Sequence, residues 1–168
     1  ADLVSCHHRI EASFSRRMEM MGDPTEYAPA ARSTGEEIDR QAKLFRDTPM
    51  FDEFMHVLPV MVMVLNSNRQ IVYANRAVLD GTGAEDISQV AGKRPGELLG
   101  CIRALTHQSG CGTTKYCRYC GAADSILKSG EGFESENECR LMVKKGRREM
   151  ALDLRVRTHP CTVGGEPF

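Results

Sequence analysis

The fold class is decided by the stretch Val60-Met61-Val62-Met63-Val64-Leu65-Asn66-Ser67-Asn68-Arg69-Gln70-Ile71-Val72-Tyr73. Its first part, Val60–Leu65, is a short apolar run with β-branched residues, which is typical of a buried strand. The polar residues 66–69 favour a turn, because Asn and Ser side chains bond their own backbone. Residues 71–73 are apolar again, so the stretch predicts a β-hairpin whose second strand covers 70–73.

Towards the C-terminus, the pattern predicts further helices and strands. After short helical pieces and a Gly-Pro-rich loop at 92–96, residues 121–129 have the composition of a helix, and 133–143 favour a long strand. Apolar and polar residues alternate over 150–156, which predicts a half-solvated strand. Residues 163–168 then favour a hairpin turn that leads into another strand. This order predicts an α+β fold in which helices cover one face of an antiparallel sheet.

The N-terminal part, residues 1–57, favours helices and a linker rather than a separate core. Cys6, Ile10, Phe14 and Met18 recur every four residues and would share one side of a helix. A linker rich in small residues follows, then a helix from Gly35 and a short helix after Thr48-Pro49, which resembles an N-cap followed by a helical proline. We expect this extension either to pack on the main domain, 58–168, or to pair two copies as a homodimer.

Composition excludes several classes of protein. The chain has 168 residues with a formal net charge of −1, so it lacks the basic excess of a nucleic-acid-binding surface. Its apolar runs are too short to span a membrane, and a secretory leader is not evident. Because the chain starts at Ala1 and ends in a turn, we expect a piece of a longer cytoplasmic protein.

The unusual feature is a cluster of cysteines. The chain has seven, and four of them follow the spacing Cys101-x9-Cys111-x5-Cys117-x2-Cys120. Four thiolates around one centre are typical of structural zinc or of an iron–sulfur cluster, and we expect one of these two groups with a slight preference for iron–sulfur. The alternatives are a thiol–disulfide switch between Cys117 and Cys120, or cysteines that act as small buried hydrophobes.

The order of elements from Leu58 to Phe168 resembles the PAS family of sensor domains. The resemblance is carried by the hairpin, by Tyr73-Ala74-Asn75-Arg76-Ala77, by Gly92-Lys93, by Leu127-Lys128-Ser129-Gly130-Glu131 and by the alternating strand at 151–157. It implies a five-stranded antiparallel sheet, a ligand beneath short helices, dimerisation through an upstream helix, and a downstream output module in the same chain, often a histidine kinase of a two-component system.

The chain departs from two well-known subgroups of that family. Leu99-Gly100-Cys101-Ile102-Arg103 lacks the motif that surrounds the reactive cysteine of flavin photosensors, and the helix at 121–129 lacks the histidine of haem sensors. Cys139 on the predicted strand is expected to be a core cysteine, with a place beside the centre as the alternative. We find no catalytic constellation, so an enzymatic activity of the whole protein stays open.

The sequence therefore predicts a cytoplasmic signal-sensing domain whose four cysteines report redox state, oxygen or metal supply. Two alternatives remain from this reasoning. One is an interaction module stabilised by zinc without a sensing role, and the other is a small thiol–disulfide redox protein.

Overall fold

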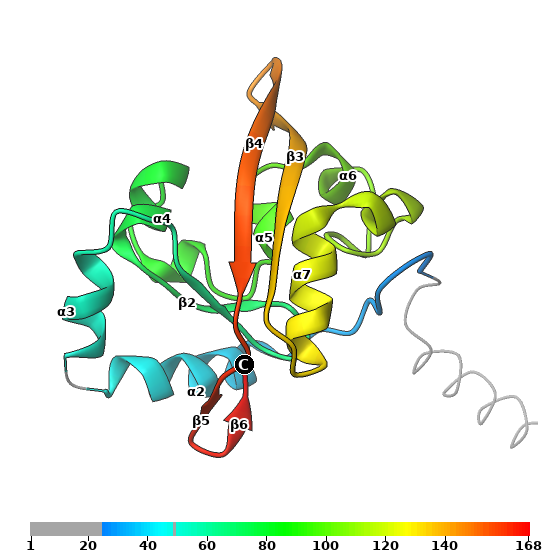
Figure 1. Ribbon diagram of the computed structural model, residues 1–168. Helices are drawn as coiled ribbons and strands as arrows, with labels where there is room; N and C mark the ends of the chain where they lie inside the picture. The colour runs from blue at the N-terminus through cyan, green and yellow to red at the C-terminus, as the bar shows by residue number, and fades with distance from the viewer. Residues whose placement is uncertain (1–24, 49) are drawn as a thin grey trace, which may run out of the picture.

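The computed structural model describes residues 25–48 and 50–168, which form a mixed α+β fold of short helices and small antiparallel sheets (Figure 1). The helix predicted over Cys6–Met18 lies outside the described residues. The elements are α2 (Gly35–Arg46), α3 (Phe51–His56), β1 (Met63–Leu65), β2 (Ile71–Ala74), α4 (Arg76–Thr82), the 3-10 helix η1 (Ile87–Gln89), α5 (Pro95–Leu98), α6 (Ile102–Leu105), the 3-10 helix η2 (Lys115–Tyr119), α7 (Gly121–Gly130), β3 (Ser135–Lys145), β4 (Arg148–Thr158), β5 (Thr162–Val163) and β6 (Glu166–Pro167).

The strands form three separate antiparallel pairs, β1–β2, β3–β4 and β5–β6. The expectation of one continuous sheet is therefore not met among the described residues. The hairpins β1–β2 and β3–β4 stay separate, since no described strand pairs with the free edge of β1 or of β4. The predicted hairpins themselves are confirmed, including the final turn between Val163 and Glu166.

The first hairpin forms the core of the molecule. All four residues of β2 are buried, and they divide between two apolar clusters. Ile71 and Ala74 pack with α4, whereas Val72 and Tyr73 pack with α2. The first strand is shorter than expected and begins at Met63, since the amide of Val62 instead donates to the side chain of Asn75 at 3.0 Å.

The helix α2 begins after a capping residue and buries one apolar face. Thr34 caps its N-terminus by accepting from the Glu37 amide, and Ile38, Ala42 and Phe45 are buried. Phe45 contacts the rings of three other aromatic residues, Phe51, Tyr73 and Phe168, at centroid distances of 5.7, 6.2 and 5.0 Å. The described part of the N-terminal extension thus packs on β2, which agrees with the expectation that it packs on the main domain.

One predicted helix boundary is wrong. The short helix α3 starts at Phe51 rather than at Pro49, and its N-cap is Met50, whose φ of 65° is left-handed and whose side chain makes no capping bond. The helix α4 continues through Gly81 to Thr82. That helix ends at Gly83, where a φ of 74° suits glycine.

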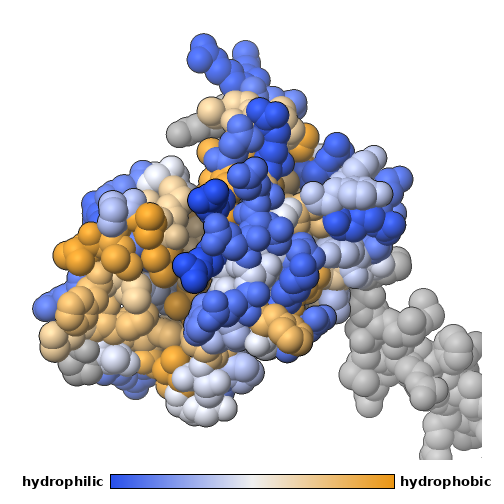
Figure 2. All heavy atoms as spheres, in the orientation of Figure 1, coloured by the Kyte–Doolittle hydropathy of each residue, from blue (hydrophilic) through white to orange (hydrophobic). Residues whose placement is uncertain are grey.

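The second hairpin, β3–β4, packs one face against α7 and leaves the other to solvent. Cys139, Leu141 and Val143 point inward from β3, and the residues between them are exposed. Figure 2 shows a hydrophilic band along β4 and an apolar area on the side of the molecule where α3 lies. Phe54, Val57 and Val60 are among the exposed apolar residues. Within the described residues, no helix is long and apolar enough to cross a membrane.

Candidate metal centre

The four predicted cysteines line one cavity. This cavity has a volume of about 490 Å³ and lies between β1, β4, the start of α7 and the cysteine segment, by which we mean Cys101–Cys120. Its wall includes Cys101, Cys111, Cys117 and Cys120 together with apolar side chains from β1 and β4 such as Met63 and Leu154. The fold therefore brings together, on one surface, thiols that are up to nineteen positions apart in the sequence.

Cys101 and Cys111 are held on one side of the cavity by close backbone contacts. The amide of Cys101 donates to the Gly96 carbonyl at 2.8 Å, and Cys101 forms an isolated bridge with Val143 of β3. Cys111 packs on Gly96, where an added Cβ would lie 2.7 Å from its sulfur. Any side chain at position 96 would thus displace Cys111 from the cavity wall.

Cys117 lies in the 3-10 helix η2, and Cys120 is the N-cap of α7. The Cys120 amide donates to the Cys117 carbonyl at 3.1 Å, which closes the turn of this Cys-x2-Cys pair. The buried Cys117 sulfur lies 3.3 Å from the Thr114 hydroxyl. The sequence motif therefore forms a compact turn at the start of a helix.

A fifth cysteine joins this group. The sulfur of Cys139 on β3 lies 3.5 Å from the sulfur of Cys120, and both belong to an apolar cluster with Leu141. The hydrogen bond between the two sulfurs lowers the pKa of Cys139 and raises the pKa of Cys120. Cys139 is therefore both a core residue, as predicted, and a direct neighbour of one predicted ligand.

The four thiols share a cavity without forming a site for a single ion. Among the described residues, no three His, Cys, Asp or Glu side chains lie close enough together to hold one metal ion. Burial raises the pKa of Cys111 to about 12, so its thiol is protonated at neutral pH in this structure. Binding of any metal by this residue must release a proton.

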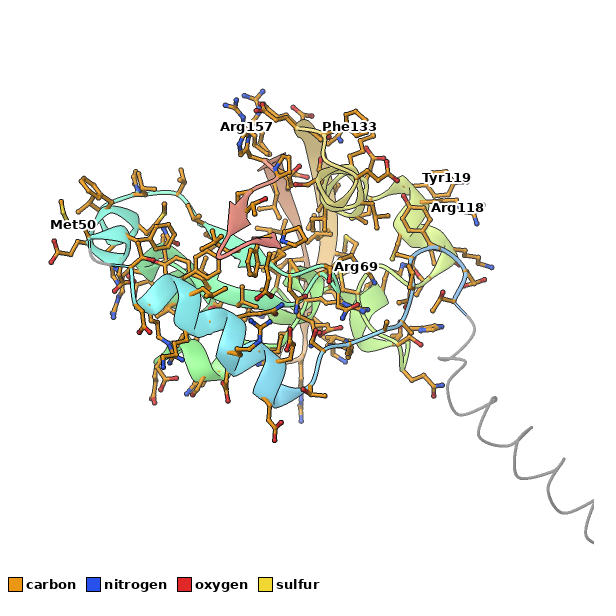
Figure 3. The ribbon with its side chains drawn as sticks, turned by 90° about the horizontal axis from the view of Figure 1, so that it is seen from below. Met50, Arg69, Arg118, Tyr119, Phe133 and Arg157 are labelled. Atoms are coloured by element: carbon orange, nitrogen blue, oxygen red, sulfur yellow. The ribbon has the colours of Figure 1, made fainter. Side chains whose placement is uncertain are left out.

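Arginine side chains supply positive charge next to the thiols. Arg69 and Arg103 both line the cavity, and Figure 3 shows Arg69 in the interior of the molecule, away from the outward-pointing Arg118 and Tyr119. The buried Nε of Arg69 finds no hydrogen-bond acceptor within the described part of the chain. An acceptor or anion in the cavity beside Cys111 would satisfy this nitrogen.

Arg94 holds the cysteine segment in place, and sequence reasoning missed it. Its side chain is fully buried, and its guanidinium donates to the carbonyls of Ser109 and Cys111, both at 3.1 Å. It also donates to the carbonyls of Asn68, Ala30 and Ala31. Burial lowers the pKa of Arg94 to about 10, which leaves it charged at neutral pH. A single arginine in a Gly-Pro-rich loop gives no signal of this role.

A stretch of chain before α2 runs along the cysteine segment. We call this stretch, Glu26–Ser33, the strap. The amides of Glu26 and Ala28 donate to the carbonyls of Thr113 and Gly112 at 2.8 and 2.9 Å. Two side chains reinforce this contact, because Arg69 donates to the Pro29 carbonyl at 2.6 Å and Arg32 pairs with Glu97. The strap leads directly into α2.

Glu97 joins the strap to the cysteine segment a second time. Its carboxylate accepts from Arg32 and from the amides of Arg94 and Cys111, the last at 3.1 Å. Burial acts to raise the pKa of Glu97, but the hydrogen bonds from Arg32 and the two amides outweigh it and lower the pKa below its ordinary value. Glu97, like Arg94, belongs to no recognisable sequence motif.

Comparison with known proteins finds no significant match to this chain. No protein-family model matches the chain, and no curated protein or solved structure shows a significant match to it. The assignment of the site therefore depends on the chemistry of its own residues.

Proposed function

We propose that the chain is a sensory input domain in which Cys101, Cys111, Cys117 and Cys120 bind an iron–sulfur cluster. The observation that carries this proposal is the arrangement of these four thiols around one cavity of about 490 Å³. Thiolates are the usual ligands of such clusters, which occupy more space than one ion. When bound, the cluster supplies a redox-active and oxygen-sensitive group.

The spacing of the thiols supports a cluster over a single zinc ion. A tetrahedral zinc site with bonds of ~2.3 Å needs sulfurs within ~4 Å of one another. The described residues do not provide three ligands gathered in that way, although they provide four thiols around one space. A cluster held by these four thiolates would fill more of that space than one zinc ion.

The surroundings of the thiols also favour an anionic group. Four thiolates carry four negative charges, so their centre needs nearby cations in a partly buried site. Arg69 and Arg103 line the same wall, and the unpartnered Nε of Arg69 offers a hydrogen bond. Within the cavity wall as the structure describes it, no acidic residue opposes this charge.

The strap supplies a path from this centre to the rest of the chain. A movement of the cysteine segment at Gly112 or Thr113 would pull on Glu26 and Ala28, and through them on α2. This arrangement supports a role in signal transduction, in which the N-terminal helices pair two copies and a downstream module, such as a histidine kinase, gives the output. We place this activity in the cytoplasm, where thiols stay reduced.

We further propose that the fold is PAS-like. The hairpins β1–β2 and β3–β4 leave one edge of β1 and one edge of β4 unpaired within the described residues, and both strands border the cavity. One more strand between them would join the hairpins into the five-stranded sheet that the resemblance implies.

The experiment that tests the proposed function is anaerobic purification followed by analysis of iron, zinc and acid-labile sulfide. We expect a brown protein with iron and sulfide in equal amounts. Cys101→Ser, Cys111→Ser, Cys117→Ser and Cys120→Ser should each lose most of both, while Cys161→Ser, at an exposed cysteine outside the cavity, should bind the normal amount.

Two results would contradict the proposal. A colourless protein with one zinc per chain would assign these cysteines to a structural site, since zinc does not change oxidation state. Loading that is unchanged in Cys111→Ser and Cys117→Ser would show that the cavity is not the binding site.

A further inference from the structure

We infer that Cys120 and Cys139 form a reversible disulfide, which withdraws Cys120 from the four-cysteine centre. The disulfide depends only on the positions of the two sulfurs. Its consequence for the centre rests on the proposed function. Cys120 would then have two exclusive partners, the bound cluster or Cys139.

The geometry of the pair suits a disulfide. The two sulfurs lie 3.5 Å apart, so they need to approach by about 1.5 Å to reach the S–S bond length of ~2.05 Å. The backbones are also close, because Gly121 at the start of α7 lies against β3. A Cβ at Gly121 would lie 2.1 Å from the Glu138 carbonyl oxygen. A small side-chain rotation therefore brings the sulfurs together without moving either element.

Access to the cavity, rather than the acidity of the two thiols, sets the order of the reaction. Cys120 is partly exposed and lines the cavity, whereas Cys139 is 4% exposed and is not part of the cavity wall. An oxidant that enters the cavity reaches Cys120 first. Cys139 is then the resolving cysteine.

The oxidant class we name is a low-molecular-weight disulfide such as glutathione disulfide. The Cys120 sulfur attacks one of its sulfurs, forms a mixed disulfide and releases one glutathione thiol. The Cys139 sulfur then attacks the Cys120 sulfur, forms the S–S bond and releases the second glutathione thiol. The two cysteines lose two electrons and two protons, and both are recovered in the two glutathione molecules.

This pairing differs from the one that sequence spacing suggests. The sequence favours Cys117 with Cys120 as the redox pair, because they form a Cys-x2-Cys motif. In the structure, the sulfur of Cys117 bonds to the Thr114 hydroxyl and the sulfur of Cys120 bonds to Cys139. The structure therefore favours the pair that joins α7 to β3.

The test is disulfide mapping in the metal-free wild-type protein. The chain is stripped with a chelator, reduced, freed of reductant, exposed to glutathione disulfide and blocked with N-ethylmaleimide. Trypsin then places Cys117, Cys120 and Cys139 in separate peptides, because Arg118, Lys128 and Arg140 follow them in turn. We expect the crosslink to join Tyr119–Lys128 to Ser129–Arg140, and a reductant to reverse it.

Variants show the role of each sulfur. Cys139→Ser cannot form this crosslink and should instead leave glutathione attached to Cys120, because the resolving thiol is gone. Cys161→Ser is the matched control and should crosslink normally. Two results in the wild-type protein would overturn the inference, whether or not the variants fold. One is a crosslink between Cys117 and Cys120. The other is that the thiols of Cys120 and Cys139 remain free after exposure to glutathione disulfide.

The effect on the centre is measured on the anaerobically loaded protein. Cys139→Ser should bind as much iron as the wild type and should lose it more slowly in glutathione disulfide. Loss of binding in Cys139→Ser would instead make Cys139 a ligand and overturn the inference. If wild-type protein binds no iron yet forms the crosslink, the proposed function fails while the disulfide stands, so the two failures are distinguishable.

Discussion

Arg94 shows how one buried side chain can organise a whole segment. Its guanidinium satisfies carbonyls from the β1–β2 turn, from the strap and from the cysteine segment. Without that group, several buried carbonyls would lose their donors, and each unsatisfied acceptor is costly. The position of Cys111 therefore depends on a residue that is not itself a ligand.

Replacing Arg94 tests this dependence. Arg94→Met should lower the free energy of unfolding by about 3–5 kcal/mol, because it leaves buried acceptors unpaired. Arg140→Met, which removes an exposed ion pair with Asp153, should cost less than about 1 kcal/mol. Urea unfolding of both variants gives the comparison, and equal losses would contradict the role of Arg94.

Glu97 should make stability depend on pH. Its pKa in the folded chain is lower than the ordinary value of 4.5. The ionised carboxylate therefore adds to the free energy of unfolding above pH 4.5, and this contribution is lost as the pH falls through the folded pKa. The stability difference between wild type and Glu97→Gln should be constant above about pH 6 and should shrink below about pH 4. A difference that is independent of pH in urea titrations would contradict this assignment.

At the scale of elements, the contact between α7 and β3 matters most, since it positions Cys120. Gly121 allows this contact, because an added Cβ would meet the backbone of β3. Gly130 at the other end of the same helix has nothing within 4 Å of an added Cβ. The two glycines thus form a matched pair for substitution.

We expect opposite effects from these two substitutions. Gly121→Ala should destabilise the protein by about 1–3 kcal/mol, because α7 must move away from β3. Gly130→Ala should be neutral or stabilise it by up to about 1 kcal/mol through helix propensity. Thermal unfolding followed by circular dichroism measures both, and a neutral Gly121→Ala would contradict the close packing.

Local patterns in the sequence predicted many elements correctly. The alternation at 150–156 and the helical composition at 121–129 reappear as β4 and α7, because local periodicity determines such elements. The start of α3 was missed, since the left-handed backbone of Met50 has no sequence signature. The joining of strands into one sheet depends on long-range contacts, which a single sequence does not encode visibly.

The site was predicted only in part, for the same reason. Spacing within one segment identified the four cysteines, and the structure places all of them on one cavity. The contact of Cys120 with Cys139 spans two elements and left no local pattern. Arg94 and Glu97 resemble ordinary surface charges until their partners are known, so only the structure could reveal them.

At the scale of the whole molecule, the N-terminal residues decide the assembly that we propose. If residues 1–24 pair two copies, the full chain should be a dimer and a chain that begins at Thr25 should be a monomer. Light scattering coupled to size-exclusion chromatography measures both masses, and circular dichroism checks that the shorter chain keeps its fold. The same oligomeric state for the full and the shortened chain would contradict dimerisation through this region.

The central claim is that the four cysteines hold a redox-active cluster in the cavity. The Mössbauer spectrum of anaerobically purified, iron-enriched protein tests it most directly, because it reports the ligands and the valence of every iron atom. We expect iron in tetrahedral sulfur coordination, with signals that change on reduction and disappear in Cys111→Ser. A wild-type protein without such iron, and with zinc bound to the same cysteines, would contradict it.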